Sequence, residues 1–534
     1  MSKELNELRS QGLRPGTTST CDSSPSSDIA GNSSLNIPAD DFNLSVDTVK
    51  IGSVVISAEI AVEAFKTFAT LFHHRLPMLL SININAIYHS SQFLFWTIIS
   101  IVTSHTLSPP SEEVFNQIVG PFQDMVRNEA LQAPLPLQKV QALLFLCTWP
   151  MPVDSQPKDP SWLYSGIAVN SALFLGLHRA GPPSARDKSS LSENNLERIK
   201  TWLGCFYVSS SLSMNFGFRT MLDSTSELSR INACLQEYPI PREFASEIKL
   251  QGIIADFNNV LSHTTNDGAS DSSILHLLDR ELDGLRSLYP DQWSRMLEYS
   301  TLVAKLHMYA QVISRDGIGN TARDILLKLS FSTALRIIYL ANTRHNEDLQ
   351  ESHGVQALRQ YGLLPKAYYK GLGFTTAFLL RYFSLNTAAS PEEQQLAANH
   401  VALSHSIFKS CSTYPIDEFG RVATVFEELC QRGPMAMDPQ RVAPGERAGV
   451  MVLVKAMKLA AQGRSNYTTS NIEPPIPPAG QPFTPEPNLN PCMNETLDPW
   501  AADMMFSDQY WSDPAWDALN LPFMETQFLP RQNG

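Results

Sequence analysis

The chain has 534 residues, of which 43% are hydrophobic, so it is long enough and apolar enough to bury a large core. Its 40 Lys and Arg residues are outnumbered by 53 Asp and Glu residues, which gives a net charge of −13 and a pI near 5.4. This balance argues against a protein that holds nucleic acid by its overall charge, because binding to phosphates needs a basic surface.

The sequence also argues against a membrane or secreted protein. The longest compact apolar run, residues 93–102, has about half of the roughly 20 residues that a membrane-spanning helix needs. The first residues, MSKELNELRSQG, contain no apolar stretch of the kind that forms a signal peptide. The seven cysteines include no C-x-x-C pair, so we expect them to be reduced core residues of an intracellular protein.

Residues 1–50 are predicted to form a disordered arm. Between residues 12 and 47 the chain is rich in Ser, Thr, Asn, Asp and Pro and has few large apolar side chains to bury. Residues 1–9 can form one short helix with Leu5 and Leu8 on the same face, but two apolar positions do not specify a coiled coil.

From residue 51 the sequence predicts helices almost without interruption, and therefore an all-α fold. One strand-like run is expected, at residues 49–56. Apolar residues then recur at helical spacing in three segments, residues 58–74, 90–103 and 111–127.

A hydrophobic pair of helices is predicted at residues 134–179, in the centre of the core. The apolar face of the first helix consists of residues at helical spacing: Leu137, Val140, Leu144 and Cys147. In the second helix Asp159 is a suitable N-cap residue, and Pro160 suits the first helical position. The second helix has almost no polar face, so we expect it to be buried on most sides, with Trp162 and Leu173 in the core.

The second helix also carries a family resemblance. Its sequence, WLYSGIAVNSALFLGLHR, resembles the middle homology region of fungal transcription factors with a six-cysteine binuclear zinc cluster. The resemblance begins at FHHRLP (residues 72–77) and extends to residue 222, and it favours the branch of the leucine-biosynthesis regulator and the regulator of secreted proteases. It implies an all-helical regulatory domain, which we expect to span residues 51–464.

Two features of the sequence depart from this family. The family's zinc cluster needs six closely spaced cysteines with basic residues between them, and this chain contains no such group. The family's Asp-Arg pair and Gly-Arg-Pro turn are replaced, within residues 208–219, by VSS and GFR. The resemblance therefore implies zinc only if a cysteine cluster lies upstream of Met1, and residues 1–9 would then be the remnant of the coiled coil that follows that cluster.

Helices are predicted to continue as far as residue 463. The same spacing of apolar residues indicates five of them, at residues 194–213, 275–288, 293–313, 321–341 and 364–383. A capping box at residues 390–393, with proline at the first helical position, starts a helix that runs towards Cys411. Two further helices are expected to end near Gly433 and Gly463.

The chain then changes in composition. Residues 465–494 are predicted to be a proline-rich linker, and residues 495–534 an acidic, aromatic activation segment. Between residues 498 and 525 six carboxylates alternate with large apolar side chains, and no Lys or Arg occurs. Five of these side chains are predicted to anchor a coactivator: Trp500, Phe506, Trp511, Trp516 and Phe523. The alternative is a tail that docks in a groove of its own domain.

The sequence contains no Walker loop, dinucleotide glycine fingerprint, H-E-x-x-H or G-x-S-x-G motif. The one close histidine pair, His73-His74, is expected to pack in the core or on the surface, because adjacent helical side chains point about 100° apart and suit one metal poorly. His178 and Arg179 are expected to interact with the negative end of the preceding helix. We therefore predict no catalytic, cofactor or metal site in this chain.

By resemblance, the chain is predicted to be a nuclear transcription regulator of RNA polymerase II genes in a fungus. Secreted protease genes, or genes of nitrogen and amino-acid metabolism, are the expected targets. The expected partners are promoter DNA through an upstream zinc cluster, coactivators through the tail, and a second copy in a homodimer, with no membrane. One alternative is an interaction protein that binds no DNA and sequesters or bridges other regulators, and another is a helical enzyme of unrecognised type.

Overall fold

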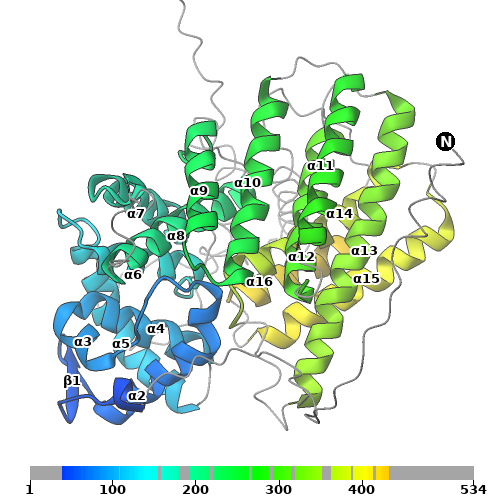
Figure 1. Ribbon diagram of the computed structural model, residues 1–534. Coiled ribbons are helices and arrows are strands. Elements are labelled where there is room, and N and C mark those ends of the chain that lie inside the picture. Colours follow the sequence, from blue (N-terminus) through cyan, green and yellow to red (C-terminus); the bar gives the residue numbers. More distant parts are fainter. Residues whose placement is uncertain are drawn as a thin grey trace, which may run out of the picture. The chain divides into compact units, whose positions relative to one another are not determined.

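The structure, a computed structural model (Figure 1), describes residues 39–106, 109–153, 158–179, 193–216, 220–263, 268–288, 293–313, 319–351, 363–386, 389–412 and 417–431. By its internal contacts the chain divides into two units, Met1–Ile37 and Pro38–Gly534, and all the described residues belong to the second. In the described residues helices dominate and the one sheet has two short strands, which confirms the predicted all-α class.

A β-hairpin stands where a single strand was expected, at residues 49–56. Two short antiparallel strands meet at a tight turn: β1 (Thr48–Ile51) and β2 (Val54–Ser57). Gly52 in the turn has a φ of 55°, a left-handed backbone conformation that glycine adopts without a steric penalty. The chain therefore reverses direction in the middle of the apolar run.

Ordered structure is already present before the expected boundary at residue 50. A 3₁₀ turn, η1, covers Ala39–Phe42, and Asn83 donates a hydrogen bond of 3.0 Å to the carboxylate of Asp41. The Ser45 hydroxyl donates to Oδ1 of Asn85 at 2.7 Å. These bonds attach residues 41–45, for which the composition predicted disorder, to the first turn of a helix.

Helices then follow one another from residue 58 to residue 263. α2 (Ala58–Thr67) continues as a π-helical turn, η2 (Phe68–Phe72), and a 3₁₀ turn, η3 (His73–Arg75), so the helix expected there is present with changes of pitch. The next elements are α3 (Ile84–Ser90), α4 (Gln92–Thr106), α5 (Pro109–Glu129), α6 (Leu137–Thr148), α7 (Ser161–Phe174), η5 (Leu177–Arg179), α8 (Glu193–Phe216), α9 (Thr225–Glu237) and α10 (Arg242–His263).

Six helices complete the described chain, and each overlaps a helix predicted for its region. They are α11 (Gly268–Leu288), α12 (Arg295–Ile313), α13 (Asn320–Glu351), α14 (Lys366–Leu385), α15 (Pro391–Cys411) and α16 (Glu418–Gln431). The capping box expected at the start of α15 is confirmed. The Glu393 N–H donates to the Ser390 hydroxyl at 3.2 Å, and the Ser390 N–H donates to the Glu393 carboxylate at 3.1 Å.

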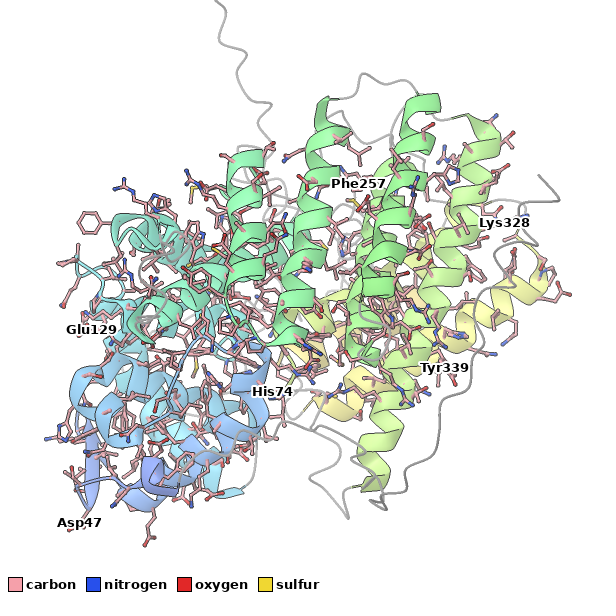
Figure 2. All side chains as sticks on the ribbon, viewed as in Figure 1. Asp47, His74, Glu129, Phe257, Lys328 and Tyr339 are labelled. Carbon is pink, nitrogen blue, oxygen red and sulfur yellow. The ribbon has the colours of Figure 1, made fainter. Side chains whose placement is uncertain are left out.

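One hydrophobic core lies among the first helices and is centred on α4. Every residue of α4 from 93 to 104 is buried, as a helix that is covered on all sides requires. Aromatic rings fill much of the space around it, and Phe68 meets Phe145 edge-to-face with 5.1 Å between ring centroids. Phe72 and Trp149 meet in the same way at 5.3 Å. Figure 2 shows how densely side chains occupy the spaces between these helices.

The exposure of α7 corrects the prediction that this helix is buried on most sides. Its buried face consists of small side chains: Ser161, Ser165, Ala168, Val169 and Ala172. Leu163 and Phe174 are 62% and 79% exposed, Trp162 is 37% exposed, and Leu173 is half-buried. α7 therefore packs closely on α6 and α8 through small residues and turns its large ones outward. The placement of Trp162 and Leu173 in the core was wrong.

A second hydrophobic cluster extends from Leu250 in α10 to Leu429 in α16. α10, α11, α12, α13 and α14 contact one another in sequence and stand side by side in Figure 1. Stacked rings mark the interior of this cluster, with Phe331 on Tyr382 at 4.5 Å and His307 on Phe374 at 3.8 Å. Among the residues that the structure describes, no helix combines the length and the apolar character that crossing a membrane requires.

Candidate functional site

The predicted activation anchors, Trp500, Phe506, Trp511, Trp516 and Phe523, lie outside the described residues. The proline-rich linker at residues 465–494 and the helix expected to end near Gly463 also lie outside them. In the part of the chain that the structure describes, three features could bind or regulate: a buried ionic cluster, a buried carboxyl group and an apolar pocket.

The ionic cluster begins with a buried pair that joins the start of α7 to the start of α14. The carboxylate of Asp159 forms a salt bridge with Nζ of Lys366, and the two side chains are 2% and 3% exposed. The Ser161 N–H donates to the same carboxylate at 2.9 Å. Burial alone would raise the pKa of Asp159, but the neighbouring Lys366 and Ser161 lower it below its ordinary value. The carboxylate is therefore charged at neutral pH.

The same contacts change the expected start of α7. The helix begins at Ser161, with Pro160 in the N-cap position, so it starts one residue later than predicted. Asp159 still satisfies a backbone N–H at the start of the helix, which is the role that an N-cap side chain has. The prediction for Asp159 identified this bond and missed its ionic partner, 207 residues further along the chain.

A second part of the cluster joins α14 to α16. Lys370 forms a salt bridge with Glu418, and the Tyr369 hydroxyl donates to the same carboxylate at 2.8 Å. Burial raises the pKa of Glu418, but Lys370 and Lys366 together outweigh this effect and lower it below its ordinary value. Nη1 of Arg421 donates to the carbonyl oxygen of Val153 at 2.6 Å. The chain just before α7 is thus tied to both α14 and α16.

A thiol lies beside this cluster, but its surroundings do not activate it. Sγ of Cys147 donates to the carbonyl oxygen of Ser161 at 3.1 Å, and burial raises the pKa of the thiol well above its ordinary value. A reactive cysteine needs a lowered pKa, so Cys147 is a structural residue. The cavity next to Cys147 and Lys366 has about 20 Å³, which is room for about one water molecule and not for a substrate.

The histidines also have structural surroundings. His73 is buried beside the ring of Phe68, and burial lowers its pKa to about 3. His74 (labelled in Figure 2) is exposed, so one histidine of the pair packs in the core and the other lies at the surface. Among the described residues, no three His, Cys, Asp or Glu side chains are grouped so that they could hold a metal ion.

The end of α7 differs in detail from the prediction. His178 and Arg179 lie beyond the helix in η5, where the His178 ring packs at 5.9 Å from Trp202. The cation that reaches the end of α7 is Arg198 of α8, whose Nη2 donates to the carbonyl oxygen of Leu175 at 2.7 Å. A basic residue therefore satisfies the helix end as expected, but it comes from the next helix.

A buried carboxyl group, Glu247 of α10, lies where α10, α12 and α14 meet. It accepts hydrogen bonds from the hydroxyls of Ser300 (2.8 Å) and Tyr368 (3.1 Å), and it is 7% exposed. Burial raises its pKa to about 7, and the two hydroxyl donors offset only part of this effect. Glu247 can therefore change its charge near neutral pH inside a helix junction.

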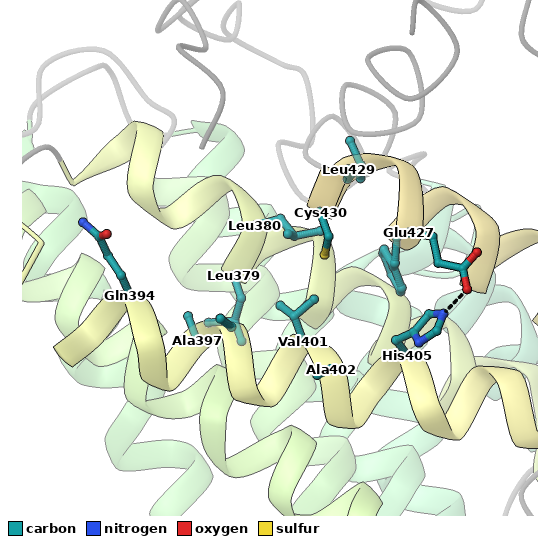
Figure 3. Close-up of a pocket in the computed structure, with 12 residues that line it drawn as sticks. Leu379, Leu380, Gln394, Ala397, Val401, Ala402, His405, Glu427, Leu429 and Cys430 are labelled. Atoms are coloured by element: carbon teal, nitrogen blue, oxygen red, sulfur yellow. Dashed lines mark hydrogen bonds and ion pairs between the residues drawn. The ribbon is translucent and has the colours of Figure 1, made fainter. Parts of the chain in front are cut away.

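The apolar pocket lies between α14, α15 and α16 and has a volume of about 480 Å³ (Figure 3). Most of its lining is aliphatic or aromatic and includes Leu379, Ala397, Val401, Ala402, Phe426 and Leu429. At one side of the pocket, Nε2 of His405 lies 2.9 Å from the carboxylate of Glu427. The sequence alone does not indicate this pocket, because its walls come from three helices whose packing is not local information.

Comparison with known proteins identifies the class of protein. Residues 65–283, from α2 to α11, match the model of the fungal specific transcription factor domain. The transcriptional regulatory protein SEF1 of Candida albicans is 28% identical over 247 residues, which are 44% of this chain and 26% of that protein. No solved structure matches the chain.

Two further relatives have a similar level of identity. SEF1 of Kluyveromyces lactis is 27% identical over 324 residues, which are 57% of this chain and 28% of that protein. The regulatory protein LEU3 of Saccharomyces cerevisiae is 29% identical over 303 residues, which are 52% of this chain and 34% of that protein. The matched region thus spans about a third or less of each relative.

Residues 65–283 are therefore similar to the fungal specific transcription factor domain, and the chain is similar to fungal proteins named as transcription regulators. The resemblance predicted from the sequence is confirmed. The matched segment contains the three cysteines Cys147, Cys205 and Cys234, far apart in sequence, and no zinc cluster.

Proposed function

We propose that the chain regulates the transcription of RNA polymerase II genes in the nucleus of a fungus. The observation that supports this proposal is the match of residues 65–283 to the fungal specific transcription factor domain, together with relatives that are transcription regulators. In that role the domain is a regulatory scaffold and not a catalyst.

The proposed target genes encode secreted proteases or enzymes of nitrogen and amino-acid metabolism. The support is the resemblance of residues 72–222 to the branch of the leucine-biosynthesis and secreted-protease regulators, and the similarity to LEU3 of Saccharomyces cerevisiae. Deleting the gene and measuring transcripts during growth on protein and on ammonium tests this assignment. We expect the deletion strain to have fewer transcripts of protease or amino-acid genes during growth on protein, but not during growth on ammonium. Unchanged transcripts in both media would contradict the assignment.

Binding to promoter DNA would require a zinc cluster upstream of this chain, with zinc held by that cluster. The polypeptide 1–534 carries a net charge of −13 and no C-x-x-C pair, so alone it should not bind a promoter specifically. A gel shift with the polypeptide, compared with the same polypeptide fused to a zinc cluster before Lys3, tests this. If neither binds while the protein still co-purifies with other regulators, the chain is an interaction protein that sequesters or bridges them.

Residues 495–528 are proposed to activate transcription by binding a coactivator. Acidic side chains keep the interleaved aromatic groups in solvent, and burial of those groups in a partner's groove supplies the binding free energy. The segment, fused to an unrelated DNA-binding domain, should drive a reporter gene. Trp511→Ala with Trp516→Ala should abolish most of that activity.

The matched control changes charge and keeps the aromatic groups. Asp508→Asn with Asp513→Asn should reduce reporter activity only partly, because the anchors remain. Reporter activity that survives the double tryptophan substitution contradicts the mechanism, and an inert fusion contradicts activation by this segment.

A further inference from the structure

The apolar pocket between α14, α15 and α16 has a buried floor and an exposed edge. Leu379, Val401 and Phe426 in the floor are almost fully buried, whereas Ala402 and Cys430 at the edge are exposed. A volume of about 480 Å³ is enough for several apolar side chains. Filling it would remove apolar surface from water and so stabilise the domain.

α16, the last helix that the structure describes, brings the following part of the chain to this pocket. Leu429 and Cys430 in its last turn belong to the pocket wall, and α16 ends at Gln431. The next 14 residues, 432–445, can span up to roughly 46 Å when fully extended. A helix that begins after this connector can therefore return to the pocket without strain in the connection.

The segment that follows the connector has the pattern of such a helix. From residue 448 to residue 461 one face carries only apolar side chains at helical spacing: Val450, Leu453, Val454, Met457 and Ala461. Glu446, at the start of the segment, falls on the same side. Lys455 lies on the opposite side, and Lys458, four residues after Val454, borders the apolar face. Pro444 and Gly445 precede the pattern and Gly463 follows it, as is typical of helix ends.

We propose that residues 446–461 form an amphipathic helix that binds in this pocket of the same chain. The apolar face inserts its aliphatic side chains between α14 and α15, in the way that an amphipathic helix fills a groove. The acidic tail at residues 495–528 is a poorer occupant, because its carboxylates alternate with its apolar side chains and would lose their hydration against the mostly aliphatic lining of the pocket. The pocket between α14, α15 and α16 is thereby covered by the segment that the chain supplies next.

The first test uses the native thiol of Cys430, which is exposed in the pocket wall. Each variant is the full chain with Cys21 and Cys492 replaced by serine and with one new cysteine in residues 446–461, either on the apolar face or on the other side. Val454→Cys and Met457→Cys lie on the apolar face, and Lys455→Cys is the matched control on the other side. After mild oxidation, peptide mass spectrometry should find disulfides from Cys430 to one or both of the first two and several-fold fewer to the third.

The second test fills the pocket and measures hydrogen exchange in the full chain. Ala402→Trp places a large side chain at the exposed edge, and Asn399→Trp places one on the exposed surface of the same helix outside the pocket. Ala402→Trp should speed exchange at residues 446–461 roughly tenfold or more, and Asn399→Trp should leave it unchanged.

Each other outcome contradicts the proposal in its own way. Unprotected exchange at residues 446–461 in the unsubstituted chain means that this segment does not bind. Protection that is lost at residues 495–528 in the Ala402→Trp variant means that the tail occupies the pocket. Disulfides found only between two molecules mean that the helix comes from a second copy.

Discussion

Asp159 and Lys366 form a charged pair that is almost fully buried. The cost of burying either charge is therefore offset only while its partner is present. Lys366→Met leaves the Asp159 carboxylate buried without its cation, and we expect a loss of about 3–5 kcal/mol in the free energy of unfolding. Asp159→Asn with Lys366→Met should cost much less than the sum of the two single changes, because the double variant buries no isolated charge. Urea unfolding of the three variants measures both quantities.

An exposed pair provides the control for this prediction. Arg127 and Asp124 form a salt bridge in α5 in which the side chains are 69% and 70% exposed. Arg127→Met should cost less than about 1 kcal/mol, since solvent screens such a pair. If Lys366→Met lowers the free energy of unfolding as little as Arg127→Met does, then water reaches the Asp159 carboxylate and the pair is not shielded from solvent.

The raised pKa of Glu247 implies that the stability of the protein depends on pH. Its pKa is about 7 in the folded protein and 4.5 for the unperturbed group, so the folded state binds the proton more tightly. The stabilisation from protonation is complete below pH 4.5 and is lost as the pH rises through about 7. The loss amounts to about 3 kcal/mol for this group.

Replacing the carboxyl group isolates this contribution. In Glu247→Gln the amide oxygen still accepts from Ser300 and Tyr368, but the group no longer ionises. Relative to the unsubstituted protein, the variant should gain stability steadily between pH 5 and pH 7 in denaturation experiments, by up to about 3 kcal/mol. Glu281→Gln, at an exposed position in α11, should keep the original pH profile. Parallel profiles for Glu247→Gln and the unsubstituted protein would exclude a titrating Glu247.

Residue-level predictions succeeded where the partner is close in sequence. The bond from Ser161 to Asp159 spans two residues and the Ser390 capping box spans three, so both follow from local sequence. The salt bridge from Asp159 to Lys366 and the hydrogen bond from Arg198 to the end of α7 depend on how distant helices pack. These two contacts could not be predicted from a single sequence, because they depend on which helices lie side by side.

At the scale of single elements, α7 shows what apolar spacing does not reveal. Leu144 of α6 is fully buried, whereas Leu163 of α7 is 62% exposed. Leu144→Ala should therefore cost about 2–5 kcal/mol, and Leu163→Ala less than about 1 kcal/mol. Thermal or urea unfolding of this matched pair measures the difference. Equal losses in the two variants would mean that the outer face of α7 is covered in the folded protein.

Helix existence was predictable because the spacing of apolar residues is a property of each segment alone. The orientation of a helix was not predictable in the same way. α7 packs on its neighbours through serine and alanine, whereas its leucine and phenylalanine, which hydrophobicity alone would place in the core, face outward. α3 has seven residues and α10 is covered on several sides, so neither carries the single apolar stripe that predicts a helix. The hairpin at Gly52 was missed because both strands are shorter than the run that contains them.

At the scale of the whole molecule, the segment that matches the family model ends within a helix, α11, and within the second hydrophobic cluster. Residue 283 lies within α11, and the second hydrophobic cluster continues from α10 and α11 through to α16. Trp149 of the first core donates from its ring N–H to the carbonyl oxygen of Leu363 at 2.9 Å. The described helices that follow the matched segment therefore complete its packing and its polar contacts.

We predict from these contacts that the matched segment does not fold alone. A fragment of residues 39–288 loses the helices that cover α10 and α11, and it leaves Asp159 without Lys366 and Glu247 without two hydroxyl donors. A fragment of residues 39–431 keeps all of these partners. The longer fragment should unfold in one cooperative transition with well-dispersed NMR signals, and the shorter should aggregate or melt without cooperativity. A sharp transition in the shorter fragment, at a similar temperature, would show that α12 to α16 are an addition to an independent domain and not a part of its core.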